Sequence, residues 1–294
     1  MPALLLSALI YICALAFVSV SAKAGASEGA EQIRAIENKS GGRIGIGAID
    51  TKNNQRIEYR PNERFPMCST FKLLAVGAVL QRVDHGKEKP DRFIPYSEKD
   101  LLEYAPVTRQ HVQEGGMKLE PLCAAAIEQS DGTAANLLLQ TIGGPGGITQ
   151  FARSIGDEVT RLDRMEPELN RWTPGDERDT TTPAMMCEDL RRLLETDLLS
   201  KESRRLLDDW LQRCQTGLAL IRAGVPTGWR VGDKTGRSGN GAINDVAVIY
   251  PPDGAPIFIA IYTFSASATD EQRSSAIASV ARIVCQTFRP EGAR

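Results

Sequence analysis

One stretch of the chain, residues 67–80, carries apolar side chains around almost its whole helical circumference. Positions 71, 73, 74, 76, 79 and 80 are apolar, so a helix here leaves almost no polar face. Pro66 directly before the stretch and the short polar Ser69 at its mouth are typical of a helix start. The pattern therefore predicts a helix that is buried inside the protein rather than lying on its surface.

Strand-like patterns occur near both ends of the chain. Residues 43–50 alternate apolar and small side chains, and residues 56–60 follow across the polar turn 51–54, which predicts a β-hairpin. Three more strands are expected late in the chain, and a closing helix follows them at about 270–287. The late strands are 230–235, 243–250 and 257–264, and the other predicted helices are 28–38, 101–104, 121–129, 133–140, 148–155, 183–195 and 201–213.

This order of elements predicts a fold with an α/β part and an all-α part. Strands from both chain ends form one antiparallel sheet of about five strands, flanked by the terminal helices, and the central helices form a large insert packed against it. We therefore expect an α/β domain from residues 25–60 and 213–294 and an all-helical domain from residues 61–212.

The first two dozen residues differ from the rest. Residues 3–20 are nearly all apolar, and the small residues at 21–24 have the spacing of a cleavage site, which predicts an export signal over residues 1–24 that is cut after Ala22 or Ala24. The segment lacks the usual basic start. A membrane anchor is the alternative, because the run is just long enough to span a bilayer. The first interpretation predicts a periplasmic or secreted protein with no stable membrane association after processing.

Charge and histidine content narrow the possible functions. The net charge is −2 with both signs interspersed, so nothing favours nucleic acid as a partner. His85 and His111 are the only histidines, which makes a histidine-based zinc site and a Ser-His-Asp triad both improbable, and we expect neither a metal nor a cofactor. Without the signal, five cysteines remain, and an odd number in an exported protein leaves at least one free thiol or an intermolecular bond.

The start of the buried helix offers candidate chemistry. Ser69 and Lys72 are three positions apart, so on a helix the amine can reach the hydroxyl. A serine hydroxyl is a poor nucleophile until a base takes its proton, and a desolvated lysine is one of the few side chains able to help. The helix N-terminus adds N–H groups where an oxyanion could form. Taken alone, the pair is better explained by a capping serine and a lysine whose amine reaches the surface, and other motifs are needed to favour the catalytic interpretation.

Three further motifs have both a structural and a functional interpretation. Ser130-Asp131-Gly132 opens a predicted helix, where an N-cap is the simple explanation. Lys234-Thr235-Gly236 ends a predicted strand and could be an ordinary strand edge. Glu166 and Asn170 lie in a long polar loop, residues 161–182, and such loops are usually functional or disordered. Ion pairs from Arg164 to Asp179 and from Arg161 to Asp163 could close the neck of this loop.

Together, in this order and spacing, the four motifs resemble those of the class A serine β-lactamases, and the resemblance covers essentially the whole mature chain. It implies a monomeric enzyme that hydrolyses small-molecule β-lactams through an acyl-enzyme. Ser69 would be the nucleophile, and the proton acceptor would be Lys72 or, through a water, Glu166. Ser130 would return a proton to the lactam nitrogen, and the oxyanion would be held by the backbone N–H groups of Ser69 and Arg237.

The resemblance also implies the substrate contacts. The substrate carboxylate would be held by Lys234 and Thr235, next to Gly236 and Ser238 on the same strand. The hydrolytic water would be held by Glu166 and Asn170, and Tyr104 would be the aromatic side chain at the cleft mouth.

The chain departs from the family pattern at several positions. Gly132 stands where asparagine is usual, which removes an amide expected to contact substrate. The arginine that many members place beyond the Lys-Thr-Gly strand is missing, so Arg237 or Arg273 could replace it, although Arg273 could equally be a solvated helix residue. In some carbapenem-hydrolysing members, a cysteine at the position of Cys68 forms a disulfide with a cysteine just after the Lys-Thr-Gly motif. In this chain the second position holds Ser238, so Cys68 should be a reduced thiol. The more widespread disulfide to Cys123 also lacks its partner, since the expected place holds the Val76–Gly77 pair.

Two other functions use similar motifs. A penicillin-binding D,D-peptidase acts on peptidoglycan with the same Ser-x-x-Lys and Lys-Thr-Gly motifs, but should lack the pair Glu166 and Asn170. A non-catalytic β-lactam sensor becomes acylated and stays so, and is normally tethered to a membrane-spanning signalling module. The presence of Glu166 and Asn170 favours the hydrolase.

Overall fold

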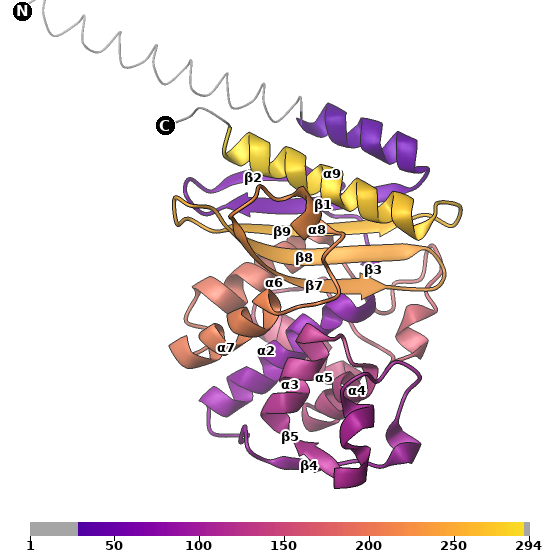
Figure 1. Cartoon of the computed structure of the whole chain (residues 1–294), viewed down its shortest axis with the longest axis vertical. Coiled ribbons are helices and arrows are strands. Elements are labelled where there is room, and N and C mark those ends of the chain that lie inside the picture. The colour runs from indigo at the N-terminus through magenta and orange to yellow at the C-terminus, as the bar shows by residue number, and fades with distance from the viewer. Residues whose placement is uncertain (1–28, 291–294) are drawn as a thin grey trace, which may run out of the picture.

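A five-stranded antiparallel sheet forms the upper half of the molecule in the computed structural model, which describes residues 29–290 (Figure 1). The strand order is β2-β1-β9-β8-β7, so strands from the two chain ends lie side by side, as the sequence predicted. The strands are β1 (Arg43–Asp50), β2 (Gln55–Tyr59), β7 (Arg230–Arg237), β8 (Ala242–Tyr250) and β9 (Ile257–Phe264).

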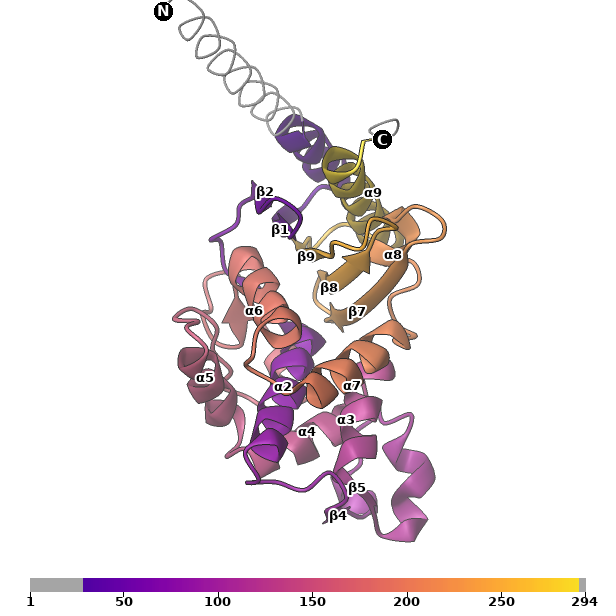
Figure 2. The same cartoon turned by 90° about the vertical axis from the view of Figure 1, so that its left-hand side faces the viewer.

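The sheet separates two hydrophobic clusters. Along β8, Ile243, Ala247 and Ile249 belong to the cluster beneath the C-terminal helix α9 (Asp270–Phe288), whereas Val246 and Val248 belong to the cluster on the helical side. This alternation arises because successive side chains of a strand point to opposite faces. Figure 2 shows α9 and α8 (Ile221–Gly224), together with the helical residues 29–40, on one side of the sheet, and the other helices on the opposite side.

The helical part is built around α2 (Phe71–Asp84), which lies at its centre. The first ten residues of α2, from Phe71 to Leu80, are all buried, which confirms the predicted buried helix. A 3-10 turn, η1 (Cys68–Thr70), precedes it. The other helices are α3 (Leu119–Glu128), α4 (Gly132–Thr141), α5 (Pro145–Ser154), α6 (Pro183–Glu195), α7 (Lys201–Gln212) and α8 (Ile221–Gly224), in addition to the helical residues 29–40.

One predicted helix is wrong. Residues 101–104 have no regular secondary structure, because their polar backbone groups bond elsewhere: Leu102 donates its N–H to Thr133 and accepts from the Arg109 side chain. Several short elements were not predicted, because they are too short to show a clear hydrophobic period. These are β3 (Phe65–Pro66), β4 (Phe93–Pro95), β5 (Gly116–Lys118), β6 (Thr180–Thr181) and the 3-10 helices η2 (Glu98–Asp100), η3 (Thr108–Glu114) and η4 (Glu168–Asn170).

The predicted export signal, residues 1–24, lies outside the described residues. Within residues 29–290, the structure contains no helix both long and apolar enough to cross a membrane. The boundaries expected for the α/β and helical domains stay a prediction.

The close packing of α6 on β1 can be tested at Gly47. A Cβ atom there would lie 2.7 Å from the Pro183 carbonyl oxygen and 2.8 Å from the Ala184 Cα, so Gly47→Ala must push the helix away from the strand. We expect a loss of about 2 kcal/mol in the free energy of unfolding, typical of an overpacked core. Thermal unfolding measures this. Gly146→Ala is the control, because a Cβ at that position has no neighbour within 4 Å, and equal melting temperatures for the two variants would contradict the prediction.

Candidate active site

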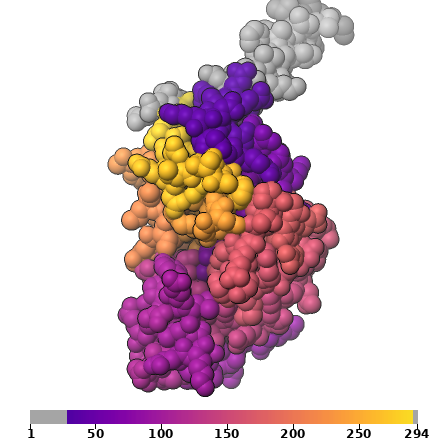
Figure 3. All heavy atoms as spheres, turned by 90° about the vertical axis from the view of Figure 1, so that its right-hand side faces the viewer, coloured from indigo at the N-terminus to yellow at the C-terminus, as the bar shows by residue number. Residues whose placement is uncertain are grey.

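A cavity of about 940 Å³ lies where the sheet edge meets the helical part. In Figure 3 the surface is hollowed where its magenta, salmon and orange parts meet. Most of the site residues expected from the sequence line this cleft. The lining is formed by Ser69, Lys72, Leu102, Glu103, Tyr104, Ser130, Gly132, Glu166, Pro167, Asn170, Thr216, Thr235, Arg237, Ser238, Gly239 and Asp270.

Ser69 is held in a constrained turn at the start of α2. Cys68 directly before it has φ of 47°, a left-handed conformation that is uncommon for a residue with a side chain. Next to it, the Thr70 hydroxyl donates to the Met67 carbonyl oxygen at 2.8 Å and contacts the Tyr262 hydroxyl at 2.9 Å. These contacts fix the turn, so the Ser69 side chain is presented to the cleft in one place.

The Lys72 ammonium joins three parts of the site. Its Nζ lies 2.9 Å from Ser69 Oγ, donates to the Ser130 carbonyl oxygen at 2.7 Å, and lies 3.1 Å from Glu166 Oε1. The side chain is only 1 % exposed, so these partners replace most of its water contacts. Ser130 itself has φ of 57° and directly precedes Asp131, whose carboxylate caps α4.

Glu166 contacts both the Ser69 hydroxyl and the Lys72 Nζ. Its Oε1 accepts a hydrogen bond from Ser69 Oγ at 3.1 Å, and its Oε2 accepts one from Asn170 Nδ2 at 2.6 Å. The Asn136 side chain holds the Glu166 backbone on both sides, accepting from its N–H at 3.0 Å and donating to its carbonyl oxygen at 2.9 Å. Sequence reasoning missed Asn136. The available signal was a single amide within the apolar run of α4.

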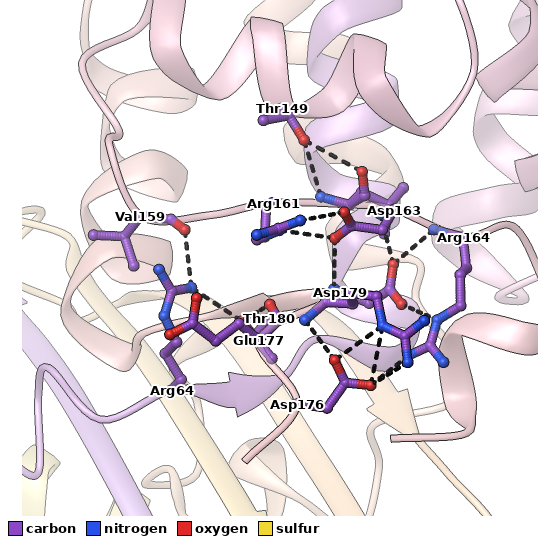
Figure 4. A network of polar contacts seen from close by, with 12 residues as sticks. Arg64, Thr149, Val159, Arg161, Asp163, Arg164, Asp176, Glu177, Asp179 and Thr180 are labelled. Atoms are coloured by element: carbon purple, nitrogen blue, oxygen red, sulfur yellow. Dashed lines mark hydrogen bonds and ion pairs between the residues drawn. The ribbon is translucent and has the colours of Figure 1, made fainter. Parts of the chain in front are cut away.

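The neck of the loop that carries Glu166 is closed by ion pairs (Figure 4). Arg164 Nε lies 2.5 Å from the Asp179 carboxylate, and Arg161 pairs with Asp163 at 2.5 Å, so both predicted pairs are present. Asp179 is fully buried and also accepts hydrogen bonds from the backbone N–H groups of Asp163 and Arg164. This network fixes the two ends of the loop against each other.

Lys234 supplies a second buried ammonium on β7. Its Nζ donates to Ser130 Oγ at 3.0 Å and to the Thr235 carbonyl oxygen at 2.7 Å. Burial, together with the charge of Lys72, lowers the pKa of Lys234 to about 8. The Thr235 hydroxyl contacts the Thr216 hydroxyl at 2.6 Å, and Thr216 also lines the cleft. Sequence reasoning missed Thr216 because nothing around it marks a motif.

The strand β7 lies next to η1, which carries Ser69. Ser238 donates its backbone N–H to Ala242, so by the alternation of an antiparallel ladder the N–H of Arg237 points away from β8, toward the open edge. Gly236 makes the close approach possible, since a Cβ there would lie 2.6 Å from the Met67 carbonyl oxygen and 3.2 Å from Cys68. The Arg237 and Ser69 N–H groups can therefore serve one oxyanion.

The two arginines that the sequence suggested as alternatives have different environments: one lines the cleft mouth and the other is buried away from it. Arg237 lines the cleft and its side chain is 49 % exposed, with an ion pair to Asp270 at 2.5 Å. Arg273 is buried, does not line the cleft, and donates to the carbonyl oxygens of Ser265 and Ala268. The expectations that Arg273 is solvated or reaches substrate are therefore wrong, because its guanidinium is used to hold the start of α9.

Two other expected residues lie at the mouth. Tyr104 is 56 % exposed, and its carbonyl oxygen accepts a hydrogen bond from the Gly132 N–H at 3.0 Å. A Cβ at Gly132 would lie 3.1 Å from this oxygen, so the absence of a side chain at 132 lets the 102–104 segment pack closely on the start of α4.

Five buried cysteines are free thiols in the described residues: Cys68, Cys123, Cys187, Cys214 and Cys285. Burial raises the pKa of Cys68 to about 12, so the thiol beside Ser69 is held in its neutral form. The predicted reduced state of Cys68 agrees with this arrangement. Among residues 29–290, no cluster of three or more His, Cys, Asp or Glu side chains is placed to hold a metal ion.

Comparisons with known proteins identify a family. The sequence model of the β-lactamase enzyme family matches residues 28–288. The chain is 44% identical over 256 residues to β-lactamase OXY-2 of Klebsiella oxytoca, covering 87% of this chain and 88% of that protein. It is 43% identical over 274 residues to β-lactamase Toho-1 of Escherichia coli, covering 93% of this chain and 94% of that protein.

Solved structures give the same result. A class A β-lactamase of the last common ancestor of Gram-negative bacteria is similar with a TM-score of 0.87 and 54% identity, covering 88% of this chain and 99% of that chain. A putative class A β-lactamase, PenP from Rhodopseudomonas palustris, is similar with a TM-score of 0.85 and 50% identity, covering 87% of this chain and 98% of that chain.

The neck of the loop gives a stability prediction. In Asp179→Asn the left-handed backbone, φ 59°, is still acceptable to the new residue, but Arg164 loses its buried counter-charge. Breaking such a pair costs about 3 kcal/mol, and we expect the melting temperature to fall accordingly. Glu177→Gln is the control, since this exposed side chain lies in the same segment without an ion pair in the described residues. An Asp179→Asn variant as stable as this control would contradict the prediction.

Proposed function

This chain belongs to the class A serine β-lactamases, and on that premise we propose which of its residues carry the hydrolysis of the β-lactam amide. The observation that supports the assignment best is the position of Ser69 Oγ, 2.9 Å from Lys72 Nζ and 3.1 Å from Glu166 Oε1. The hydroxyl is thus within proton-transfer distance of the Glu166 carboxylate and, when Lys72 is in its neutral amine form, of a second acceptor, which is what an activated serine requires. Ser69 is the proposed nucleophile.

In the proposed first half-reaction, Ser69 Oγ attacks the lactam carbonyl carbon. Its proton passes to the neutral amine of Lys72 or to Glu166, whose Oε1 accepts directly from Ser69 Oγ at 3.1 Å; a route through a water requires the carboxylate to move away from the hydroxyl. The carbonyl oxygen becomes an oxyanion next to the N–H groups of Ser69 and Arg237. When the C–N bond breaks, Ser130 gives its proton to the ring nitrogen. Ser130 suits this role because its hydroxyl lies 3.0 Å from Lys234 Nζ and 3.4 Å from Lys72 Nζ, through which it can be reprotonated.

The substrate carboxylate is proposed to bind beside β7. Thr235 lines the cleft and offers a hydroxyl, and the buried Lys234, whose Nζ donates to Ser130 Oγ at 3.0 Å, offers a charge. Arg237 adds a second cation at the mouth. Because these groups come from neighbouring residues of one strand, their spacing is set by the strand itself.

In the proposed second half-reaction, Glu166 and Asn170 hold a water against the acyl ester. Glu166 takes a proton from the water while the water oxygen attacks the ester carbon. The bond between that carbon and Ser69 Oγ then breaks, and Oγ regains a proton from Lys72 or from the protonated Glu166, which releases the product acid and restores the enzyme. The 2.6 Å contact between Asn170 Nδ2 and Glu166 Oε2 and the Asn136 clamp on the Glu166 backbone support this role, because they orient the carboxylate toward Ser69.

The alternatives differ from this proposal in deacylation. A D,D-peptidase or a β-lactam sensor would form the same ester but would have no reason to place a carboxylate 3.1 Å from the nucleophile.

We also propose that the mature enzyme is a monomer, exported to the periplasm or secreted, with no stable membrane association. An N-terminal apolar segment with a small-residue cleavage site supports export.

Glu166→Ala should separate the two half-reactions. Without the base, the acyl-enzyme accumulates, which mass spectrometry detects as the mass of one intact penicillin on the protein, while turnover collapses by a factor on the order of a hundred or more. Acylation slows as well if Glu166 also serves that step. Glu168→Ala, an exposed residue of the same loop, is the control and should retain turnover. Ser69→Ala should show no adduct at all. Parental turnover by Glu166→Ala would refute the proposed mechanism.

The pKa of Lys234 predicts the pH dependence. This lysine binds the substrate carboxylate only while protonated, and its pKa is about 8 in the free enzyme. The value of kcat/KM for a penicillin should therefore fall as the pH rises through about 8, since kcat/KM reports on the free enzyme. Lys234→Arg should lose this alkaline limb, because a guanidinium keeps its charge. An unchanged alkaline limb in Lys234→Arg would assign it to another group.

A further inference from the structure

Three charged side chains, Arg237, Asp270 and Arg273, form a row of ion pairs from the cleft mouth to the start of α9. Asp270 Oδ2 lies 2.5 Å from Arg237 Nη1, and Asp270 Oδ1 lies 2.5 Å from Arg273 Nη2. One carboxylate thus bridges two guanidinium groups. Arg237 and Asp270 both line the cleft, and their side chains are 49 % and 58 % exposed, whereas that of Arg273 is 8 % exposed.

Arg273 holds Asp270 in place. Besides Asp270, its guanidinium donates to the carbonyl oxygens of Ser265 and Ala268 at 2.6 Å each, so it cannot move into the cleft without losing both bonds. Asp270 is also the first residue of α9, where the helix N-terminus favours a negative charge. The hydrogen bond from Arg273, assisted by Arg237, lowers the pKa of Asp270, which keeps the carboxylate ionised at neutral pH.

Of these three side chains, Arg237 is the one that can change its ion-pair partner. Its exposed guanidinium has one carboxylate partner, Asp270, among the described residues. Thr235 and Arg237 are two positions apart on β7, so their side chains lie on the same face, with Cα atoms about 6.6 Å apart. An anion bound at Thr235 is therefore within reach of the arginine side chain, and Asp270 and that anion would compete for it.

We propose that Asp270 is a positioning residue that sets the selectivity of the cleft for anionic β-lactams, by holding Arg237 away from the substrate carboxylate. The inference rests on the proposed binding of that carboxylate beside Lys234 and Thr235. Each substrate must share or displace the Arg237–Asp270 pair on binding. β-Lactams with a second anionic group are disfavoured by the nearby Asp270 carboxylate, and β-lactams with a cationic group near their carboxylate are favoured by it.

The experiment is a double-mutant cycle with Asp270→Asn, Arg237→Ala and the combined variant, assayed with one penicillin of single negative charge. Asparagine keeps an oxygen that can accept from Arg273, so the start of α9 retains this contact, and melting temperatures check that the fold is intact. Glu271→Gln is the matched control. It removes an equal charge from the adjacent exposed residue in the first turn of the same helix, and therefore reports any effect of charge that acts at long range.

We expect Asp270→Asn to lower KM by about threefold, the scale of an exposed ion pair, with kcat changed less than twofold. Arg237→Ala should raise KM, and Asp270→Asn should have no further effect in that background. Glu271→Gln should match the parent. A KM for Asp270→Asn that is unchanged or raised, or a decrease that persists in the Arg237→Ala background, would overturn the inference.

The same data separate this inference from the proposed function. If Arg237→Ala raises KM but Asp270→Asn does not lower it, Arg237 serves the substrate and Asp270 is only structural, so the inference alone fails. If neither substitution alters KM, the proposed role of Arg237 in carboxylate binding fails together with the inference, while the roles of Ser69 and Glu166 are untouched.

Discussion

The buried ammonium of Lys72 is the constraint on which the rest of the site depends. A charge that is 1 % exposed is costly unless hydrogen bonds and a counter-charge replace its water. Here they come from Ser69 one turn earlier, from Ser130 before α4, and from Glu166 in the long loop. Because one small group must satisfy all three, these segments cannot shift independently. The relative positions of Ser69, Ser130 and Glu166, the proposed nucleophile, proton donor and base, follow from the need to solvate one cation inside the protein.

Three residues around the site have strained backbones, and contacts from the surrounding structure hold each of them in place. The residues at 68, 130 and 179 all have left-handed backbones, with φ between 47° and 59°, although none is glycine. Each costs free energy and persists only where its surroundings over-determine it. Tyr262 and Thr70 hold the first, the Asp131 cap holds the second, and Arg164 holds the third. All three conformations lie at the ends of segments that deliver a functional side chain, which is where stored strain is usually found.

Charge is distributed differently at the floor and at the mouth of the cleft. On the floor, two buried lysines face Ser130, and burial together with Lys72 lowers the pKa of Lys234, so the cationic character of the floor falls as the pH rises through about 8. At the mouth, an exposed arginine, a carboxylate and a buried arginine alternate. Because two guanidinium groups share one carboxylate, the set keeps a net positive charge. In the proposed function the floor would attract the substrate carboxylate, and in the further proposal the mouth would discriminate among anions.

The sequence by itself determined the chemistry of the site and most of the elements. Ser69 and Lys72 are one helical turn apart, and the β8 and β9 segments are short, mostly apolar runs, so local patterns were sufficient to predict them. The resemblance carried by four short motifs then gave the family. Local spacing could not predict Asn136, Thr216 or the bridge from Asp270 to Arg237, because their partners lie 19 to 33 residues away along the chain. It also misplaced Arg273, whose burial depends on the carbonyl groups that the turn into α9 leaves without partners. Those contacts exist only after the sheet edge, the loop and the helix start have come together, and so the tertiary structure alone decided them.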